Sequence, residues 1–191
     1  TQPFAARTHT RRSRRKRPVI SPPASSNRRP QSVGSNKSRQ VEYTHPRGIY
    51  HSPLFTQDTD VAGFFKLGAW ISLDQPDTDI MVGVSEVKAD GSSVYLAGDS
   101  LRARYRKSLR EAEPVKPGAI ERYDFSRFSF VARRIAKGSR LRLMIAPMNS
   151  MYAEKNYNAG GVVSAETGKD ARKVTVTLYH DAAHPSALTV P

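Results

Sequence analysis

Few residues of this 191-residue chain have the types and spacing that catalysis requires. A nucleophilic serine needs a sharp turn between a strand and a helix, with small residues on either side. The nearest match is Ser85, in the segment Gly-Val-Ser-Glu-Val at 83–87. That segment lacks the second glycine, and it lies inside an apolar run typical of a strand. We therefore predict that Ser85 is not an activated nucleophile and that the chain has no catalytic residue of its own.

Two pairs of aspartates stand at short spacing near predicted turns. They are Asp77 with Asp79, and Asp58 with Asp60. Such a pair can place two carboxylates on one side of a loop, where they would bind a hard cation. Aspartates at turns also accept hydrogen bonds from nearby backbone amides, which is their commoner role. The sequence leaves both interpretations open.

The densest titratable cluster is formed by His180, Asp181 and His184. A His–Asp pair without a nucleophile or a phosphate-binding loop is not an active site, and the following Pro185 indicates a turn. His45 and His51 lack the spacing of zinc ligands on a helix, and the chain contains no cysteine. We predict no metal site and no cofactor.

A long polar segment at 149–161 is the other candidate for function. Loops of this length within a compact domain are usually functional or interfacial. The side chains of this segment suit contact with a partner or a sugar. With the aspartates and the histidine cluster added, the candidate interface or ligand-facing residues are Asp77, Asp79, Met151, Tyr152, Asn156, Tyr157, Asn158, His180, Asp181 and His184.

The elements that position these residues are predicted to be strands. In the segment 137–147 a Gly-Ser turn is followed by Leu141, Leu143 and Ile145, which alternate with polar or exposed positions. The same period of two places Phe65 to Leu73 on one face of a strand. Further strands are expected at 80–87, 93–97, 101–105, 119–125, 173–180 and 187–190, with an irregular or edge segment at 41–55.

About eight strands with turn signals between them predict an all-β domain. Residues 61–97 are interpreted as a β-meander, with turns at 74–77, 88–91 and 98–99. Such a chain is expected to fold as a β-sandwich or jelly roll over residues 41–191. The arginine-rich segment 101–113 is interpreted as a solvated face or interface rim, with a polyanion surface as the alternative.

Positive charge is concentrated at the start of the chain. Residues 1–40 contain eleven Lys and Arg and no Asp or Glu, whereas residues 41–191 carry a net charge of only +3. This Pro- and Ser-rich arm has too little apolar surface to fold alone, so we predict that it is disordered. It could contact a polyanion, act as a nuclear-localisation signal, or be a linker without a role of its own.

The chain begins at Thr1 and its first Met is Met81, so we expect it to be a piece of a longer protein. No apolar run is long enough to span a membrane, and no signal peptide is visible. These features leave localisation open and favour the cytoplasm slightly over other compartments.

Five segments occur in an order that resembles a known family: Tyr-His-Ser-Pro-Leu-Phe at 50–55, Asp-Thr-Asp-Ile at 77–80, Leu-Arg-Ala-Arg-Tyr-Arg at 101–106, Lys-Gly-Ser-Arg-Leu-Arg-Leu at 137–143 and Tyr-His-Asp-Ala-Ala-His-Pro-Ser-Ala-Leu at 179–188. Together they resemble the C-terminal β-sandwich domain of X-Pro dipeptidyl-peptidase and cocaine-esterase-like (CocE/NonD) serine hydrolases. The resemblance covers residues 41–191.

The resemblance implies a jelly roll similar to galactose-binding domains, which follows an α/β-hydrolase domain carrying the Ser–Asp–His triad. It therefore implies a non-catalytic accessory domain whose partner is an α/β-hydrolase domain or subunit, with a homo-oligomer as a further option. An apolar docking patch is expected, and its candidates are Phe64, Phe65, Trp70, Met148, Met151, Tyr152 and Tyr157. The alternatives are a coat-like jelly roll that binds nucleic acid through its arm, and a carbohydrate-binding module that uses Tyr152 or Tyr157 with Asn156 and Asn158.

Overall fold

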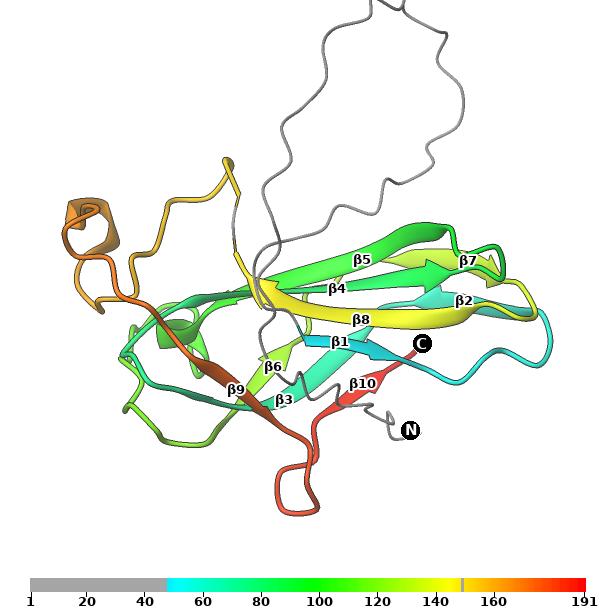
Figure 1. Ribbon diagram of the computed structural model, residues 1–191, viewed down its shortest axis with the longest axis horizontal. Coiled ribbons are helices and arrows are strands. Elements are labelled where there is room, and N and C mark those ends of the chain that lie inside the picture. Colours follow the sequence, from blue (N-terminus) through cyan, green and yellow to red (C-terminus); the bar gives the residue numbers. More distant parts are fainter. Residues whose placement is uncertain (1–47, 149) are drawn as a thin grey trace, which may run out of the picture.

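The computed structural model describes residues 48–148 and 150–191 and is built almost entirely from strands (Figure 1). The strands are β1 (Gly48–His51), β2 (Thr59–Gly63), β3 (Lys66–Leu73), β4 (Asp79–Val87), β5 (Ser93–Arg102), β6 (Glu121–Phe125), β7 (Val131–Ile135), β8 (Arg140–Pro147), β9 (Val176–Tyr179) and β10 (Ala187–Thr189). Two short 3₁₀ turns, η1 (Ala103–Tyr105) and η2 (Val163–Ala165), complete the regular structure. No helix in these two ranges is long and apolar enough to cross a membrane.

The first sheet has four antiparallel strands in the order β1-β8-β4-β5. Strands β4 and β5 form a hairpin closed by a turn at Gly91, where φ is +81°. A register shift between Val84 and Ser85 marks a bulge in the β4–β5 pairing. Alternate residues of β8, from Leu141 to Ile145, enter the core, as their period of two predicts.

The second sheet is organised around β3, which has partners along both edges. It pairs with β6 along one edge, while β9 and β10 share the other edge. Leu67, for example, lies opposite Phe125 on one side and Leu188 on the other. Strands β2 and β7 form a separate two-stranded antiparallel pair.

The core fills the space between the two sheets, which lie one above the other in Figure 1. The β3 side chains that were predicted to share a face are all buried there, from Phe65 to Leu73. The other large, fully buried apolar side chains come from different strands: Val61, Val82, Val84, Tyr123, Phe125, Ile135 and Leu141. The predictions of an all-β chain and of a β-sandwich are confirmed.

Four details of the predicted topology are wrong. Strands β3 and β4 belong to different sheets, so residues 61–97 are not a meander. The predicted turn at 98–99 lies inside β5, which continues to Arg102 because it stays paired with β4 along this length. Residues 131–135 were not assigned to a strand, yet they form β7. A break at Phe64 and Phe65 also divides the predicted strand 61–73 into β2 and β3.

The remaining fold predictions concern finer features. A jelly-roll strand order and a likeness to galactose-binding domains stay predictions. The predicted disorder of residues 1–40 concerns a segment outside the described residues.

Candidate docking loop and its ion-pair network

Asp77 and Asp79 lie at one end of the first sheet and are both paired with arginines. The Asp77 side chain is fully buried, and its Oδ2 accepts a hydrogen bond of 2.7 Å from Arg104 Nε. Its Oδ1 accepts one of 2.9 Å from the Arg104 backbone amide. Asp79 Oδ1 and Oδ2 accept from Arg102 Nε and Nη2 at 2.8 and 3.1 Å. This bidentate pairing is the strongest geometry available to an arginine and a carboxylate.

The chain direction explains why these four residues meet. Asp79 begins β4 and lies opposite Arg102, the last residue of β5, in the antiparallel register. The 3₁₀ turn η1 begins after Arg102, and the Ala103 backbone amide donates to the carbonyl of Thr78. This bond holds Arg104 beside Asp77. The hairpin therefore brings together two short segments that are separated by more than twenty residues.

Asn156 joins this ion-pair network to the long loop at 150–175. Its Nδ2 donates to both Asp77 Oδ2 and Asp79 Oδ1, at 2.7 and 3.0 Å. Its Oδ1 accepts from the backbone amide of Asn158 at 2.8 Å. Asn158 adopts a φ of +64°, a conformation that asparagine tolerates better than most residues. One amide side chain thus fixes the loop to both aspartates.

Further contacts fasten the rest of the loop. Arg104 Nη1 donates to the carbonyl of Gly161 at 2.8 Å, and Asn158 Nδ2 donates to the carbonyl of Arg172 at 2.8 Å. Glu166 accepts from the backbone amides of Tyr157 and Gly161. Although residues 150–175 contain no strand, the loop is held at several points along its length.

The interpretation of segment 101–113 as a solvated face or rim is wrong for its central arginines. The side chains of Arg104 and Arg106 are only 11% and 1% exposed. Arg106 lies 2.6 Å from Glu121 and 3.2 Å from Glu113. One signal was visible in the sequence, because the alternating arginines at 102 and 104 match the two-residue spacing of Asp77 and Asp79.

The geometry assigns the two aspartates a structural role. Two guanidinium groups and one amide already occupy their oxygens, and the pKa of Arg102 is raised because Asp79 accepts its hydrogen bond. Arg104 Nη2 is buried without a hydrogen-bond partner in the described part of the chain. Within that part, no group of three or more potential metal-ligating side chains is found. The network can therefore clamp a loop, whereas a cation would have to displace charges already present.

The clamped loop presents two large apolar side chains to solvent. Met151 and Tyr152 are 89% and 94% exposed. Tyr157 is half-buried, and Lys155 Nζ lies 5.0 Å from the centre of its ring, within the range of a cation–π contact. Exposed Met and Tyr on a loop whose base is fixed are typical of a protein–protein contact.

The other predicted patch residues lie elsewhere. Phe65 is fully buried in the core, and Trp70 and Met148 are half-buried. Phe64 is 54% exposed and packs edge-on against Phe130, with ring centres 5.4 Å apart.

His180, Asp181 and His184 lie in the turn between β9 and β10. Asp181 Oδ1 accepts from the backbone amides of Ala183 and His184 at 2.9 and 2.8 Å, and the hydrogen bond from His184 lowers the pKa of Asp181. The ring of His184 packs against Trp70 and Tyr179. These contacts are those of a capped turn.

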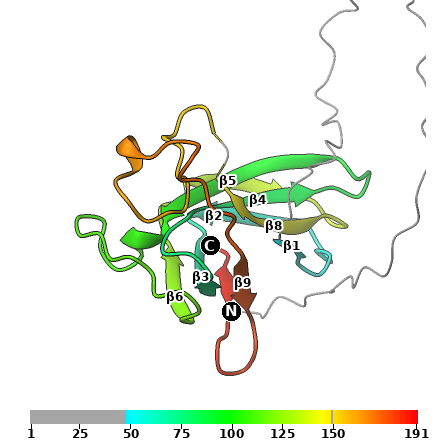
Figure 2. The same ribbon diagram turned by 60° about the vertical axis from the view of Figure 1, so that its left-hand side comes forward.

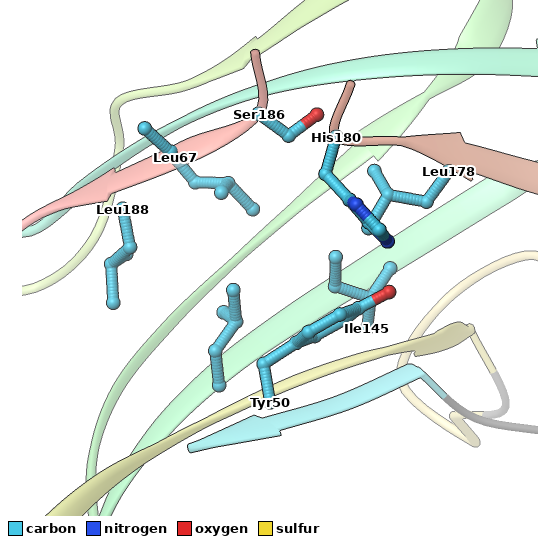
Figure 3. Close-up of a pocket in the computed structure, with 9 residues that line it drawn as sticks. Tyr50, Leu67, Ile145, Leu178, His180, Ser186 and Leu188 are labelled. Carbon is cyan, nitrogen blue, oxygen red and sulfur yellow. The ribbon is translucent and has the colours of Figure 1, made fainter. Parts of the chain in front are cut away.

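His180 lines a small cavity between the first sheet and the β9–β10 edge (Figure 3). Its ring lies edge-on to Tyr50, with ring centres 6.4 Å apart. The cavity volume is about 30 Å³, which is enough for one or two water molecules. Most of the lining is aliphatic, with Leu67, Ile145, Leu178 and Leu188 around it. The cavity is too small for a sugar.

Ser85 lies in the middle of β4, as its sequence context predicts. Its cross-strand partners are Tyr95 on β5 and Arg142 on β8, and neither is a histidine that could act as its base.

Comparisons with known proteins agree on one family. The family model described as the X-Pro dipeptidyl-peptidase C-terminal non-catalytic domain matches residues 5–189. The chain is 22% identical over 142 residues to the cocaine esterase of Rhodococcus sp. (strain MB1 Bresler), and this match covers 74% of the chain and 25% of the esterase.

Solved structures show the same fold. One is an aminopeptidase from a marine sediment Thaumarchaeota archaeon, with a TM-score of 0.73, 19% identity, and coverage of 81% of this chain and 27% of the aminopeptidase. Another is an α-amino acid ester hydrolase, with a TM-score of 0.74, 17% identity and the same two coverages. The chain thus spans about a quarter of the length of these relatives.

Proposed function

Because the chain belongs to the family of X-Pro dipeptidyl-peptidase C-terminal non-catalytic domains, we propose that it is the accessory domain of a serine hydrolase that cleaves esters or X-Pro peptides. In this proposal an α/β-hydrolase catalytic half supplies the nucleophile, the base and the acid. The β-sandwich supplies a rigid surface and the loop at 150–175. Its role is to shape the substrate entrance or the assembly of the enzyme.

The observation that carries this proposal is that the side chains which could perform catalysis already bond to other groups of the domain or lie within a sheet. Asp77, Asp79 and Asp181 are occupied by arginine, asparagine or backbone donors, and Ser85 lies within a sheet beside Arg142. A catalytic carboxylate or histidine needs an accessible lone pair or proton facing a substrate. The clamped loop, by contrast, places exposed Met151 and Tyr152 where a second domain can cover them.

The direct test is hydrolysis by the purified chain of p-nitrophenyl esters and X-Pro-anilides, together with labelling by a fluorophosphonate. We expect neither turnover nor a labelled serine, and Ser85→Ala should behave like the unchanged chain. Turnover that is lost in Ser85→Ala would overturn the proposal. The control is a family member of full length, which must be labelled under the same conditions.

Two finer proposals concern other partners. The basic segment 1–40 would contact a polyanion, because eleven cations without an acid release many counterions on binding phosphates. Its test is RNA binding that falls steeply with salt and disappears when residues 1–40 are deleted. Assembly of the domain into a homo-oligomer is tested by sedimentation at several protein concentrations.

A carbohydrate-binding role has less support from the site. Asn156 and Asn158 are already occupied with Asp77, Asp79 and the backbone of the loop. Only Tyr152 among the predicted sugar-binding residues is fully accessible. A thermal shift on adding galactose or cellobiose would revive this alternative.

A further inference from the structure

The outer face of the first sheet, which points away from the second sheet, has an unusual composition. The residues of β1, β4, β5 and β8 that alternate with the core positions define it: Ile49, His51, Asp79, Met81, Gly83, Ser85, Val87, Ser93, Tyr95, Gly98, Ser100, Arg102, Arg140, Arg142, Met144 and Ala146. Antiparallel strands with one face in water usually alternate apolar and polar residues. Here Tyr95 is 66% exposed and Ile49 is 51% exposed, and they share the face with two methionines.

The centre of this face is flat because two glycines lie side by side. Gly83 and Gly98 are cross-strand partners, and the Tyr95 ring lies over them. A Cβ at Gly83 would be 3.4 Å from Tyr95 Cε2 and 3.8 Å from Met144 Cε. The tyrosine and the methionine therefore cover the backbone. Tyr, Met and Arg are the side chains enriched in the buried centres of protein interfaces, whereas Lys, Glu and Asp are depleted there.

One side of the face carries two cations without an acidic partner. Arg140 and Arg142 form no ion pair within 48–148 and 150–191. Among the described residues, the one side-chain hydrogen bond of Arg142 goes to His51 Nε2 at 3.1 Å, so the histidine accepts with a neutral ring. Burial lowers the pKa of His51, and both arginines lower it further.

The acids of these strands cannot neutralise the two arginines. Asp79 is paired with Arg102, and Glu86 lies 2.6 Å from Arg133. The third acid, Asp99, accepts from the backbone of Arg127 at 2.9 Å. The face therefore combines apolar surface with positive charge, and it complements a surface that is apolar and negatively charged.

We propose that this outer face is the surface on which the α/β-hydrolase catalytic half docks, with carboxylates of that half paired to Arg140 and Arg142. The inference rests on the proposed function and specifies where the contact occurs. The loop at 150–175 rises on the same side of the sheet, beside the end of β8 (Figures 1 and 2). Its exposed Met151 and Tyr152 extend the docking surface beyond the sheet.

Charge distinguishes the catalytic half from two other occupants. Residues 1–40 contain no acid, so this basic segment would repel Arg140 and Arg142. A second copy that presents the same face would oppose like charges, since each acid of the four strands already has a partner.

The test is photo-cross-linking from the centre of the face. Tyr95 is replaced by p-benzoylphenylalanine in the 191-residue chain, which is expressed in its source cells, and the adducts are sequenced by mass spectrometry. The expected adduct is an α/β-hydrolase polypeptide with Asp or Glu near the cross-linked position. Arg140→Glu combined with Arg142→Glu should lower its yield at least about tenfold, because one partner of each charge pair is reversed.

Two controls keep the result interpretable. Lys66→Glu reverses one charge at an exposed position of β3 in the other sheet and should leave the yield unchanged. Arg140→Lys with Arg142→Lys keeps the charge and should retain most of the adduct, and circular dichroism checks that all variants fold. The inference is overturned by the absence of an adduct, by an adduct to a second copy or to RNA, or by an adduct that survives the double reversal. None of these results would produce a fluorophosphonate-labelled serine in the chain, so failure of the proposed function remains distinguishable.

Discussion

Replacing Asp77 by asparagine tests whether the ion-pair network holds the 150–175 loop. The side chain is 0% exposed and accepts three hydrogen bonds, two from Arg104 and one from Asn156. Asparagine keeps the size but loses the charge, so Arg104, which is 11% exposed, is left without its counter-ion. In addition, asparagine has only one side-chain oxygen. If that oxygen keeps the bonds from Arg104 Nε and Asn156 Nδ2, its NH₂ group faces the Arg104 backbone N–H, which is also a donor.

The magnitude follows from the burial of the pair. Removing one partner of a buried ion pair destabilises a protein by about 3–5 kcal/mol. Because Arg104 retains the carbonyl of Gly161 as an acceptor, we expect the lower end, about 3 kcal/mol. For a domain of this size, that corresponds to a fall in Tm of about 10 °C.

The assay is urea unfolding followed by the fluorescence of Trp70, the only tryptophan of the chain. Limited trypsin digestion reports separately on the loop, where we expect faster cleavage after Lys155 and Arg172. The matched control is Asp60→Asn, because Asp60 pairs with Arg134 at 2.8 Å but both side chains are more than 65% exposed. Surface pairs of this kind contribute little to stability.

The reasoning is refuted if Asp77→Asn unfolds at the same urea concentration as Asp60→Asn. It is also refuted if the variant is destabilised while cleavage of the loop is unchanged. In the first case the buried pair would have no net value, and in the second the loop would be held by other contacts.

Three further predictions concern single positions. Tyr123→Phe should leave the free energy of unfolding, measured in urea, unchanged or raise it. The buried Tyr123 hydroxyl has no hydrogen-bond partner among the described residues, and burial raises its pKa. Clear destabilisation would show that the hydroxyl is bonded. His51→Gln should flatten the pH dependence of stability below about 6.5. Since the pKa of His51 is lower in the folded state, the unfolded chain binds more protons at this residue. The stability of the unchanged chain should therefore fall as the pH drops through that range. Equal slopes of unfolding free energy against pH for the two proteins would contradict this. Gly160→Ala should destabilise the domain and accelerate tryptic cleavage of the loop. At Gly160 φ is +84°, and the new Cβ would lie 2.7 Å from Pro76 Cγ. Unchanged cleavage would contradict this, because the loop would then accommodate the Cβ without losing its contacts.

Local pattern was sufficient to predict most of the strands. The alternation from Phe65 to Leu73 predicted a buried face, and every one of those side chains is buried. The turns at Gly91 and Gly138 were also predictable, since both adopt a positive φ that favours glycine. The assignment to sheets was not predictable in the same way, because β3 and β4 are adjacent in sequence but lie in different layers.

The candidate site likewise combines features that are local in the sequence with features that depend on the tertiary structure. The sequence by itself determined an all-β chain without a catalytic serine motif, and it identified Asp77, Asp79 and Asn156 as residues of interest, because residue type and period are local properties. Only the tertiary structure decided that Asn156 bonds both aspartates, across separations of 79 and 77 residues. It likewise placed Arg140 and Arg142 on an outer face without an acidic partner among the described residues. Pairing between distant residues depends on how the sheets are ordered and stacked, and the free energy that selects this order comes from burial of the whole core rather than from any one segment.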